Sequence, residues 1–236
     1  MSRLRKPKAG FWIRLAVVIL YPLDGLLFRI RWRDLDRIPA TGGVIIAINH
    51  ISHIDTVLMA RLVWQSGRVP RFLVKNTMFE KRVVGTIMRG ANQIPVYRGT
   101  TDAAKSLHAA VEALRGGEAV VIYPEGTVTK DPAQWPMQAK TGVARLALLS
   151  PDVPIIPIGQ WGAQEVDKRR FRPVVRASIG APVDVSGFRG AEPTGPVLRE
   201  ITDAVMAAVR DEVAAVRGEA PPDTFYIHGN AVEVTD

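Results

Sequence analysis

Beyond residue 40, the sequence alternates short apolar runs with stretches of helical periodicity. The apolar runs have the length of strands and cover residues 44–48, 71–74, 93–96, 119–123, 154–159 and 174–179. The helical stretches separate the first five of these runs and cover residues 53–65, 77–88, 101–115 and 141–149. Such alternation is typical of a parallel sheet with helices on both faces. The sequence therefore predicts an α/β fold with a largely parallel central sheet flanked by helices.

This pattern divides the chain of 236 residues into three parts. We expect residues 36–217 to form the α/β domain, which closes with an amphipathic helix over 197–217. Residues 1–35 are expected to precede the sheet as a helical segment, and residues 218–236 are expected to form an irregular tail. A domain of this length can bury a substantial core.

Polar side chains follow three of the predicted strands at the points where these strands end. They lie at 49–55, at Arg98 and at 125–127. Ligands of α/β sheets bind beyond the carboxyl ends of the strands, where loops from different strands meet. We therefore expect these three groups to converge at one edge of the sheet.

The seven residues 49–55, Asn-His-Ile-Ser-His-Ile-Asp, bring an imidazole, a hydroxyl and a carboxylate together. Ser52 is followed three residues later by Asp55, which is a capping-box pattern at a helix start. His50 then lies in the strand-to-helix turn and Asp55 in the first helical turn, so the chain can fold the carboxylate back toward the imidazole. A histidine oriented by a carboxylate can activate a hydroxyl near neutral pH.

Two other interpretations fit the same seven residues. In the first, Asp55 only caps a helix and His50 bonds to the backbone of a loop. In the second, His53 is the base, although it lacks a carboxylate at the matching distance. The rest of the chain has to decide between them.

Three further segments follow in a fixed order. Residues 93–99 end a strand with Arg98, residues 120–127 end in Pro-Glu-Gly-Thr, and residues 153–158 contain two prolines. Together with the pair His50 and Asp55, this ordered set resembles the glycerolipid acyltransferase family over residues 36–165. That family includes the 1-acylglycerol-3-phosphate and glycerol-3-phosphate acyltransferases, so the resemblance implies an O-acyltransferase.

The resemblance also implies a role for each matching residue. His50 corresponds to the family's general base, which takes the proton from the acceptor hydroxyl, and Asp55 corresponds to its orienting carboxylate. Arg98 corresponds to the arginine that holds the phosphate of the acceptor. The other matches are expected to bind substrate, and they are Asn49, Ser52, Lys75, Glu125, Gly126, Thr127 and Lys140.

At one position the chain departs from the family pattern. The segment that contains Pro-Glu-Gly-Thr usually continues with an arginine, and here that residue is Val128. If the arginine normally shares the phosphate, this chain lacks one charge-assisted contact. Either Lys130, Lys140 or Arg98 compensates, or the acceptor has a different head group.

Composition argues against several other chemistries. The chain has no cysteine and no Gly-x-Ser-x-Gly nucleophile elbow, which agrees with direct attack of an acceptor hydroxyl on an acyl thioester. The donor, acyl-CoA or acyl carrier protein, is then a substrate, and we expect no cofactor. The four histidines show no metal-binding spacing, so we expect no metal site.

A formal net charge of +8 at pH 7 indicates an anionic partner. A membrane surface, the phosphates of the donor and nucleic acid all qualify, but nucleic acid is disfavoured because no recognised nucleic-acid-binding motif is present. The densest basic cluster, residues 168–172, is either a binding surface or a solvated turn.

The N-terminal residues favour the membrane. Basic residues lie on both sides of the apolar stretch 15–23, which is too short to cross a bilayer and lacks a signal-peptide cleavage site. Trp12 and Trp32 flank it. This arrangement is typical of two short helices that are separated near Pro22 and lie in one leaflet of a membrane. The alternative is a helix packed on the protein's own core. We expect a monotopic or peripheral protein at the cytoplasmic face of the cell membrane.

The whole sequence therefore predicts transfer of a fatty acyl group from a thioester to a hydroxyl of glycerol phosphate or lysophosphatidic acid, in phosphatidic acid synthesis. One alternative keeps the reaction and changes the acceptor to another lysolipid or a glycolipid. A second is a non-catalytic lipid-binding membrane protein, and a third is a thioester hydrolase. The oligomeric state stays open.

Overall fold

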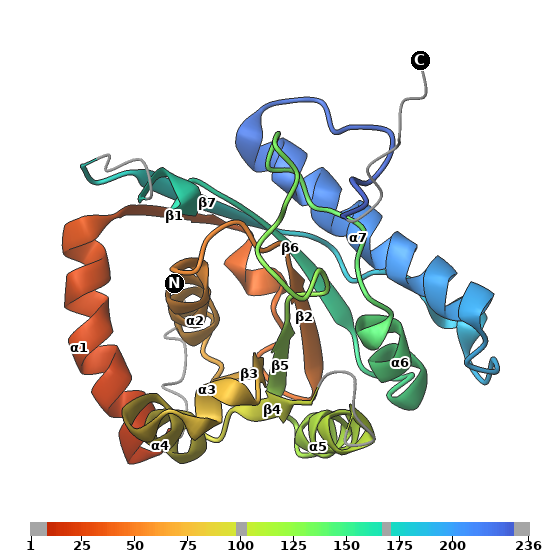
Figure 1. Cartoon of the computed structure of the whole chain (residues 1–236), viewed down its shortest axis with the longest axis horizontal. Helices are drawn as coiled ribbons and strands as arrows, with labels where there is room; N and C mark the ends of the chain where they lie inside the picture. Colours follow the sequence, from red (N-terminus) through yellow and green to blue (C-terminus); the bar gives the residue numbers. More distant parts are fainter. Residues whose placement is uncertain (1–8, 98–102, 167–170, 229–236) are drawn as a thin grey trace.

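The computed structural model describes residues 9–97, 103–166 and 171–228, in which helices cover both faces of a central sheet (Figure 1). The strands are β1 (Arg29–Arg33), β2 (Val44–Ile48), β3 (Pro70–Lys75), β4 (Ile94–Val96), β5 (Ala119–Ile122), β6 (Ile155–Trp161) and β7 (Val174–Ile179). The α-helices are α1 (Phe11–Leu27), α2 (Asp55–Gln65), α3 (Thr77–Glu80), α4 (Arg82–Gly90), α5 (Ala103–Arg115), α6 (Gly142–Leu149) and α7 (Gly195–Arg217). Short 3₁₀ turns are η1 (Leu35–Arg37), η2 (Ala163–Val166) and η3 (Ser186–Phe188).

The sheet has seven strands in the order β1-β7-β6-β2-β5-β3-β4. The five strands from β6 to β4 are parallel to one another. Strand β7 pairs antiparallel with β6, and β1 pairs parallel with β7. The prediction of an α/β fold with a largely parallel sheet is therefore confirmed.

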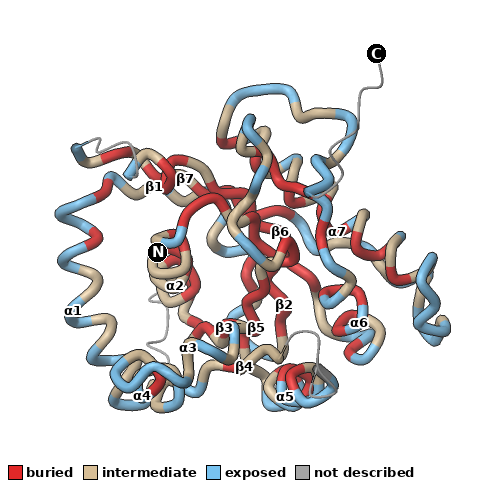
Figure 2. Tube along the Cα trace, viewed as in Figure 1, coloured by how far each residue is buried: buried red, intermediate tan, exposed pale blue. Residues whose placement is uncertain are grey.

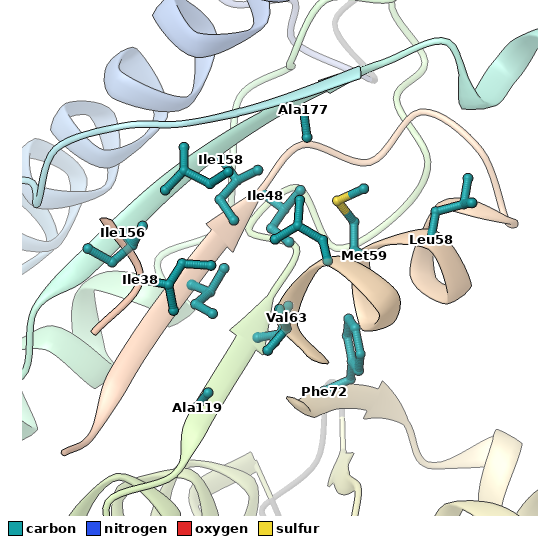
Figure 3. Packing of buried hydrophobic residues seen from close by; sticks show 14 of the residues in the cluster. Ile38, Ile48, Leu58, Met59, Val63, Phe72, Ala119, Ile156, Ile158 and Ala177 are labelled. Carbon is teal, nitrogen blue, oxygen red and sulfur yellow. The ribbon is translucent and has the colours of Figure 1, made fainter. Parts of the chain in front are cut away.

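Strand β2 lies in the middle of the sheet and is buried along its whole length. Its side chains alternate between two cores, as the period of a strand requires. Ile46 and Ile48 pack with Leu58 and Met59 of α2 on one face (Figure 3), whereas Ile45 packs on the opposite face with α5, α6 and α7. Burial on both faces explains why β2 is a continuous apolar run in the sequence.

Helix α7 crosses directly over β6. A Cβ atom on Gly159 would collide with the main chain of α7 at Glu212 and Val213. Glycine at this position therefore lets the last helix pack against the strand without an intervening side chain. Beyond α7, residues 218–228 contain no helix, and the main chain of Tyr226 pairs with that of Met137.

The N-terminal segment differs from the expectation in two ways. Helix α1 continues through Pro22 as one helix, so the expected pair of short helices is wrong. Residues 29–33, placed in the helical segment, form the edge strand β1. The reason lies in the alternation of this strand: Ile30 and Trp32 pack against the core, while the three arginines that alternate with them face away.

Helix α1 stands at the border of the molecule and leaves much of its surface in solvent (Figures 1 and 2). Its inner side is tied to α2, because the Tyr21 hydroxyl donates to the Arg61 carbonyl and the Arg61 guanidinium donates to the Tyr21 carbonyl. In the part of the chain that the structure describes, no helix combines the length and apolar character needed to cross a membrane.

Candidate functional site

The candidate site lies where β2 and β5 end. These strands are parallel neighbours, with Ile46 opposite Val121, so the loops that follow them meet at the same edge of the sheet (Figure 1). The turn of residues 49–54 leads from β2 into α2, and residues 123–141 lead from β5 into α6. The residues at 49–55 and 125–127 thus come together, as the sequence predicts.

His50 and Asp55 touch in the arrangement expected from their spacing. The Nδ1 atom of His50 lies 3.0 Å from Oδ2 of Asp55, and Asp55 is completely buried as the first residue of α2. A carboxylate accepts hydrogen bonds only, so Nδ1 of the neutral imidazole carries the proton and Nε2 carries the lone pair. The His50 side chain keeps 15% of its surface exposed, which leaves the ring accessible from outside.

The same Asp55 oxygen also orders the turn that precedes it. Oδ2 accepts the backbone N–H of Ile51 at 2.9 Å and that of Ser52 at 3.0 Å. Only this half of the predicted capping box forms: α2 has no side-chain cap, and the Ser52 hydroxyl accepts the N–H of Ile54 at 3.5 Å instead. One carboxylate oxygen therefore fixes both the imidazole and the backbone around it.

Glu125 connects two loops by accepting a backbone N–H from each. Its buried carboxylate accepts the backbone N–H of His50 at 2.8 Å through Oε1 and that of Met137 at 3.0 Å through Oε2. Burial raises the pKa of Glu125 to about 8, the two amides oppose this rise, and the charges of Asp55 and Asp131 add to it. Glu125 thus holds the main chain of His50 in place.

The loop of residues 127–138 holds His50 from its other side. The N–H of Thr129 donates to the His50 carbonyl at 2.7 Å, and the Thr129 hydroxyl donates to the Trp135 carbonyl at 2.8 Å. Trp135 is buried and lies under the Arg217 guanidinium, which also stacks on Trp161; both ring centroids are 4.1 Å from it. Arg217, the last residue of α7, therefore packs this loop against the end of β6.

Asn49 joins strands in this structure. Its side-chain amide donates to the Gln160 carbonyl at 3.1 Å, and its side-chain carbonyl accepts the Gln160 N–H at 2.8 Å. The Gln160 side chain donates in turn to the Asn49 carbonyl at 2.9 Å. Both residues are fully buried, so Asn49 fixes the end of β2 on β6 and does not face the solvent.

The remaining predicted residues have different surroundings. Gly126 makes the turn after β5 with a φ of 74°, which favours glycine, and its N–H donates to the Tyr123 carbonyl at 2.9 Å. Thr127, Lys75 and Lys140 are exposed. Arg98, expected to hold a phosphate, lies outside the described residues, as does most of the basic cluster 168–172. His53 is exposed, with its ring centroid 6.4 Å from that of His50.

Sequence reasoning missed Tyr123, the residue just before Pro-Glu-Gly-Thr. Its ring stacks on the imidazole of His50, with centroids 4.3 Å apart and planes inclined by 24°. The available signal was an aromatic residue at the carboxyl end of an otherwise aliphatic strand. Among the residues that the structure describes, no three histidine, aspartate or glutamate side chains are grouped as metal ligands.

Comparison with known proteins adds three findings. A sequence model of the family described as Acyltransferase matches residues 29–161. A 1-acyl-sn-glycerol-3-phosphate acyltransferase of Bacillus subtilis (strain 168) is 22% identical over 179 residues, which cover 75% of this chain and 84% of that protein. The crystal structure of the 1-acyl-sn-glycerophosphate (LPA) acyltransferase of Thermotoga maritima superposes with a TM-score of 0.65 at 22% identity, over 89% of this chain and 81% of that one. The structural likeness shows a shared fold.

Proposed function

The chain belongs to the acyltransferase family, and we propose that it transfers a fatty acyl group from a thioester to a hydroxyl of a lysophosphatidic acid or glycerol phosphate acceptor. The observation that carries the proposal is the contact between His50 and Asp55, which leaves Nε2 of an accessible imidazole free to accept a proton. The relatives from Bacillus subtilis and Thermotoga maritima, named as acyltransferases acting on such lipids, support the choice of acceptor.

The proposed reaction needs no covalent enzyme intermediate. Nε2 of His50 takes the proton of the acceptor hydroxyl while the oxygen attacks the thioester carbonyl, and Asp55 stabilises the imidazolium that forms. The tetrahedral intermediate then collapses, the carbon–sulfur bond breaks, and the imidazolium returns its proton to the leaving thiolate. The products are the ester and the free thiol. Acyl-CoA and acyl carrier protein both supply this thioester, and no cofactor is required.

Recognition of the acceptor phosphate is proposed to fall to cations near the same sheet edge. Lys75 ends β3 and Lys140 follows the 127–138 loop, and both are exposed. Arg98 would follow β4. Val128 stands where the family usually has an arginine, and a valine cannot make the charge-assisted contact with a phosphate that an arginine could make there. This residue is the reason to keep a different lysolipid or glycolipid as a second candidate acceptor.

We place the reaction at the cytoplasmic face of a membrane, with α1 as the contact. The outer side of α1 exposes large apolar side chains, among them Phe11 at 69%, Val18 at 70% and Leu26 at 66%. Apolar residues along one side of a helix can enter the headgroup region of a bilayer, and a net charge of +8 favours anionic lipids.

A transfer assay against a panel of acceptors tests the proposed function. The protein, in liposomes, is mixed with palmitoyl-CoA and, in separate reactions, with glycerol 3-phosphate, lysophosphatidic acid, a neutral lysolipid and a glycolipid. Free thiol is measured, and the product is identified by mass spectrometry. Thiol release that depends on lysophosphatidic acid supports the proposal, whereas release that needs no alcohol indicates a hydrolase. A preference for an acceptor without phosphate would move the assignment to the second candidate.

A further inference from the structure

Tyr123 lies in a stack of three rings that ends at the proposed base. Phe72 of β3 is buried and packs against Tyr123, with centroids 6.3 Å apart and planes inclined by 15°. On its other side, Tyr123 packs against the imidazole of His50 at 4.3 Å and 24°. The ring of Tyr123 therefore forms a wall along one face of the imidazole, backed by the core.

The polar end of Tyr123 is also unusual. Its hydroxyl oxygen is buried and has no hydrogen-bond partner among the described residues. The same holds for Oδ1 of Asp55, although Oδ2 of that carboxylate accepts hydrogen bonds from His50, Ile51 and Ser52. Buried polar atoms without partners are rare in folded proteins, and when present they often mark a functional site.

The two unpaired atoms belong to side chains that both contact the His50 imidazole: Tyr123 stacks on the ring, and Asp55 binds its Nδ1 atom. Burial raises the pKa of Tyr123 well above its ordinary value; the Asp55 carboxylate raises it further, and Thr56 opposes the shift. Tyr123 consequently stays protonated and has a hydrogen to donate. The Asp55 carboxylate is the acceptor in this neighbourhood that has an oxygen to spare.

We propose that Tyr123 is a positioning residue for His50: its ring fixes the plane of the imidazole, and its hydroxyl supplies the hydrogen bond that Oδ1 of Asp55 lacks. The inference rests on the proposed role of His50 as the base. A single hydrogen bond at Nδ1 leaves the imidazole able to swing about that bond. The stack removes this freedom, so Nε2 faces the acceptor hydroxyl in one orientation, as efficient proton transfer requires.

The hydroxyl has a second, electronic effect. A hydrogen bond to Oδ1 draws charge from the carboxylate and lowers its ability to stabilise the imidazolium. The other ionisable groups near the ring are Glu125, which binds the His50 main chain, and the exposed His53. Neither changes when Tyr123 is replaced, so a shift in the titration of His50 reports on the hydroxyl.

Two variants separate the ring from the hydroxyl. Y123F keeps the stack and removes the hydroxyl, and Y123L removes both. F72L is the matched control, because it removes an aromatic ring from the same stack at the position that does not contact His50. The kinetic parameters kcat and KM are measured as a function of pH with palmitoyl-CoA and lysophosphatidic acid. The His50 ring signals are followed by nitrogen-15 NMR in the same pH range without substrate.

We expect Y123L to lose about 30-fold in kcat with little change in KM, because the base is misoriented while substrate binding is intact. Y123F should keep kcat within about five-fold and move the acid limb of kcat/KM and the NMR midpoint to higher pH by about half a unit. If Y123L merely lowers the melting temperature, as F72L should, and leaves kcat and both pH profiles unchanged, Tyr123 is core packing and the inference is overturned.

The two readouts distinguish this inference from the proposed function. Absence of transfer by the wild-type protein would remove the proposed reaction, whereas the NMR titration would still show whether Tyr123 acts on His50. Normal wild-type transfer, with an unchanged kcat and unshifted pH profiles in Y123F and Y123L, would remove the inference alone.

Discussion

Oδ2 of Asp55 lies 3.0 Å from Nδ1 of His50 and accepts the backbone N–H groups of Ile51 and Ser52 as well. Helix α2 begins at Asp55, so the carboxylate is fixed by the start of a helix and in turn fixes the strand-to-helix turn. This relationship determines which tautomer His50 adopts, and it leads to the first prediction.

The D55N variant should fold but lose most of its activity. An amide oxygen in the place of Oδ2 keeps the two backbone bonds and still accepts from Nδ1, but it carries no negative charge to stabilise the imidazolium that forms during the reaction. The same substitution in the triad of a serine protease costs about 10⁴-fold in kcat, and we expect a loss of about 10³-fold or more here. Steady-state transfer rates together with a circular dichroism spectrum check this. A folded D55N protein with near wild-type kcat would show that Asp55 serves only the backbone.

Glu125 should make stability depend on pH. Its pKa is raised from 4.5 to about 8 in the folded protein, so the folded state keeps a proton that the unfolded chain releases. The resulting contribution is complete below pH 4.5 and is lost as the pH rises through about 8. Free energies of unfolding measured by urea denaturation from pH 4 to 9 should therefore show this loss.

The E125Q variant is the comparison for that measurement. Glutamine does not titrate, and its amide N–H₂ faces one of the two backbone donors, so E125Q should be less stable by about 1–3 kcal/mol at low pH. The difference between wild type and E125Q should shrink as the pH rises from 4.5 to about 8. A constant difference, or one that grows with pH, would contradict the assigned direction.

The stability that Arg217 contributes by stacking should depend on its planar guanidinium. Arg217 lies between Trp135 and Trp161, and its side chain donates to the Ala133 carbonyl. Lysine keeps the charge but cannot stack on both rings, so R217K should lower the free energy of unfolding by about 1–2 kcal/mol. Chemical denaturation measures this value.

R210K is the control for the R217K measurement. Arg210 lies on the same helix and over a single ring, that of Phe225, at 5.0 Å. We expect R210K to cost less than R217K and to leave the 127–138 loop as resistant to proteolysis as in the wild type. Equal losses in the two variants would mean that the position between two tryptophans has no special importance.

The proposed membrane contact is tested by a charge on α1. Val18 is 70% exposed on α1, and Val83 is equally exposed on α4, so V18E and V83E make a matched pair. Burying a valine in an apolar environment is worth about 1.5 kcal/mol, so V18E should reduce the fraction bound to anionic liposomes by about ten-fold or more. Liposome flotation measures the bound fraction. Equal binding of V18E and wild type would rule out α1 as the contact, whereas an equal loss in V83E would show that the effect is not specific to α1.

Much of the sheet was predictable because its central strands are buried on both faces. The apolar runs 44–48 and 174–179 coincide with β2 and β7. Strand β1 was missed because arginines alternate with Ile30 and Trp32, so it does not form a continuous apolar run. Pro22 suggested a break in α1, yet the helix continues through it. The strand order depends on packing between distant segments and is not encoded in local patterns.

The candidate site was likewise predictable only in part. His50 and Asp55 were predictable because five positions separate them and a helix start fixes their geometry. The bonds between Asn49 and Gln160 join residues 111 positions apart, and the bond from the His50 N–H to Glu125 spans 75. No local pattern reveals such pairs. The family resemblance singled out Asn49 and Glu125, and the structure shows which backbone groups they bind.

The most direct test of the proposed chemistry is the rate of acyl transfer by H50A relative to wild type, measured as thiol release that depends on lysophosphatidic acid. If Nε2 of His50 takes the acceptor proton, kcat should fall by about 10³-fold, while the melting temperature stays close to that of the wild type. An H50A protein that is folded and transfers the acyl group at a rate near that of the wild type would contradict the account.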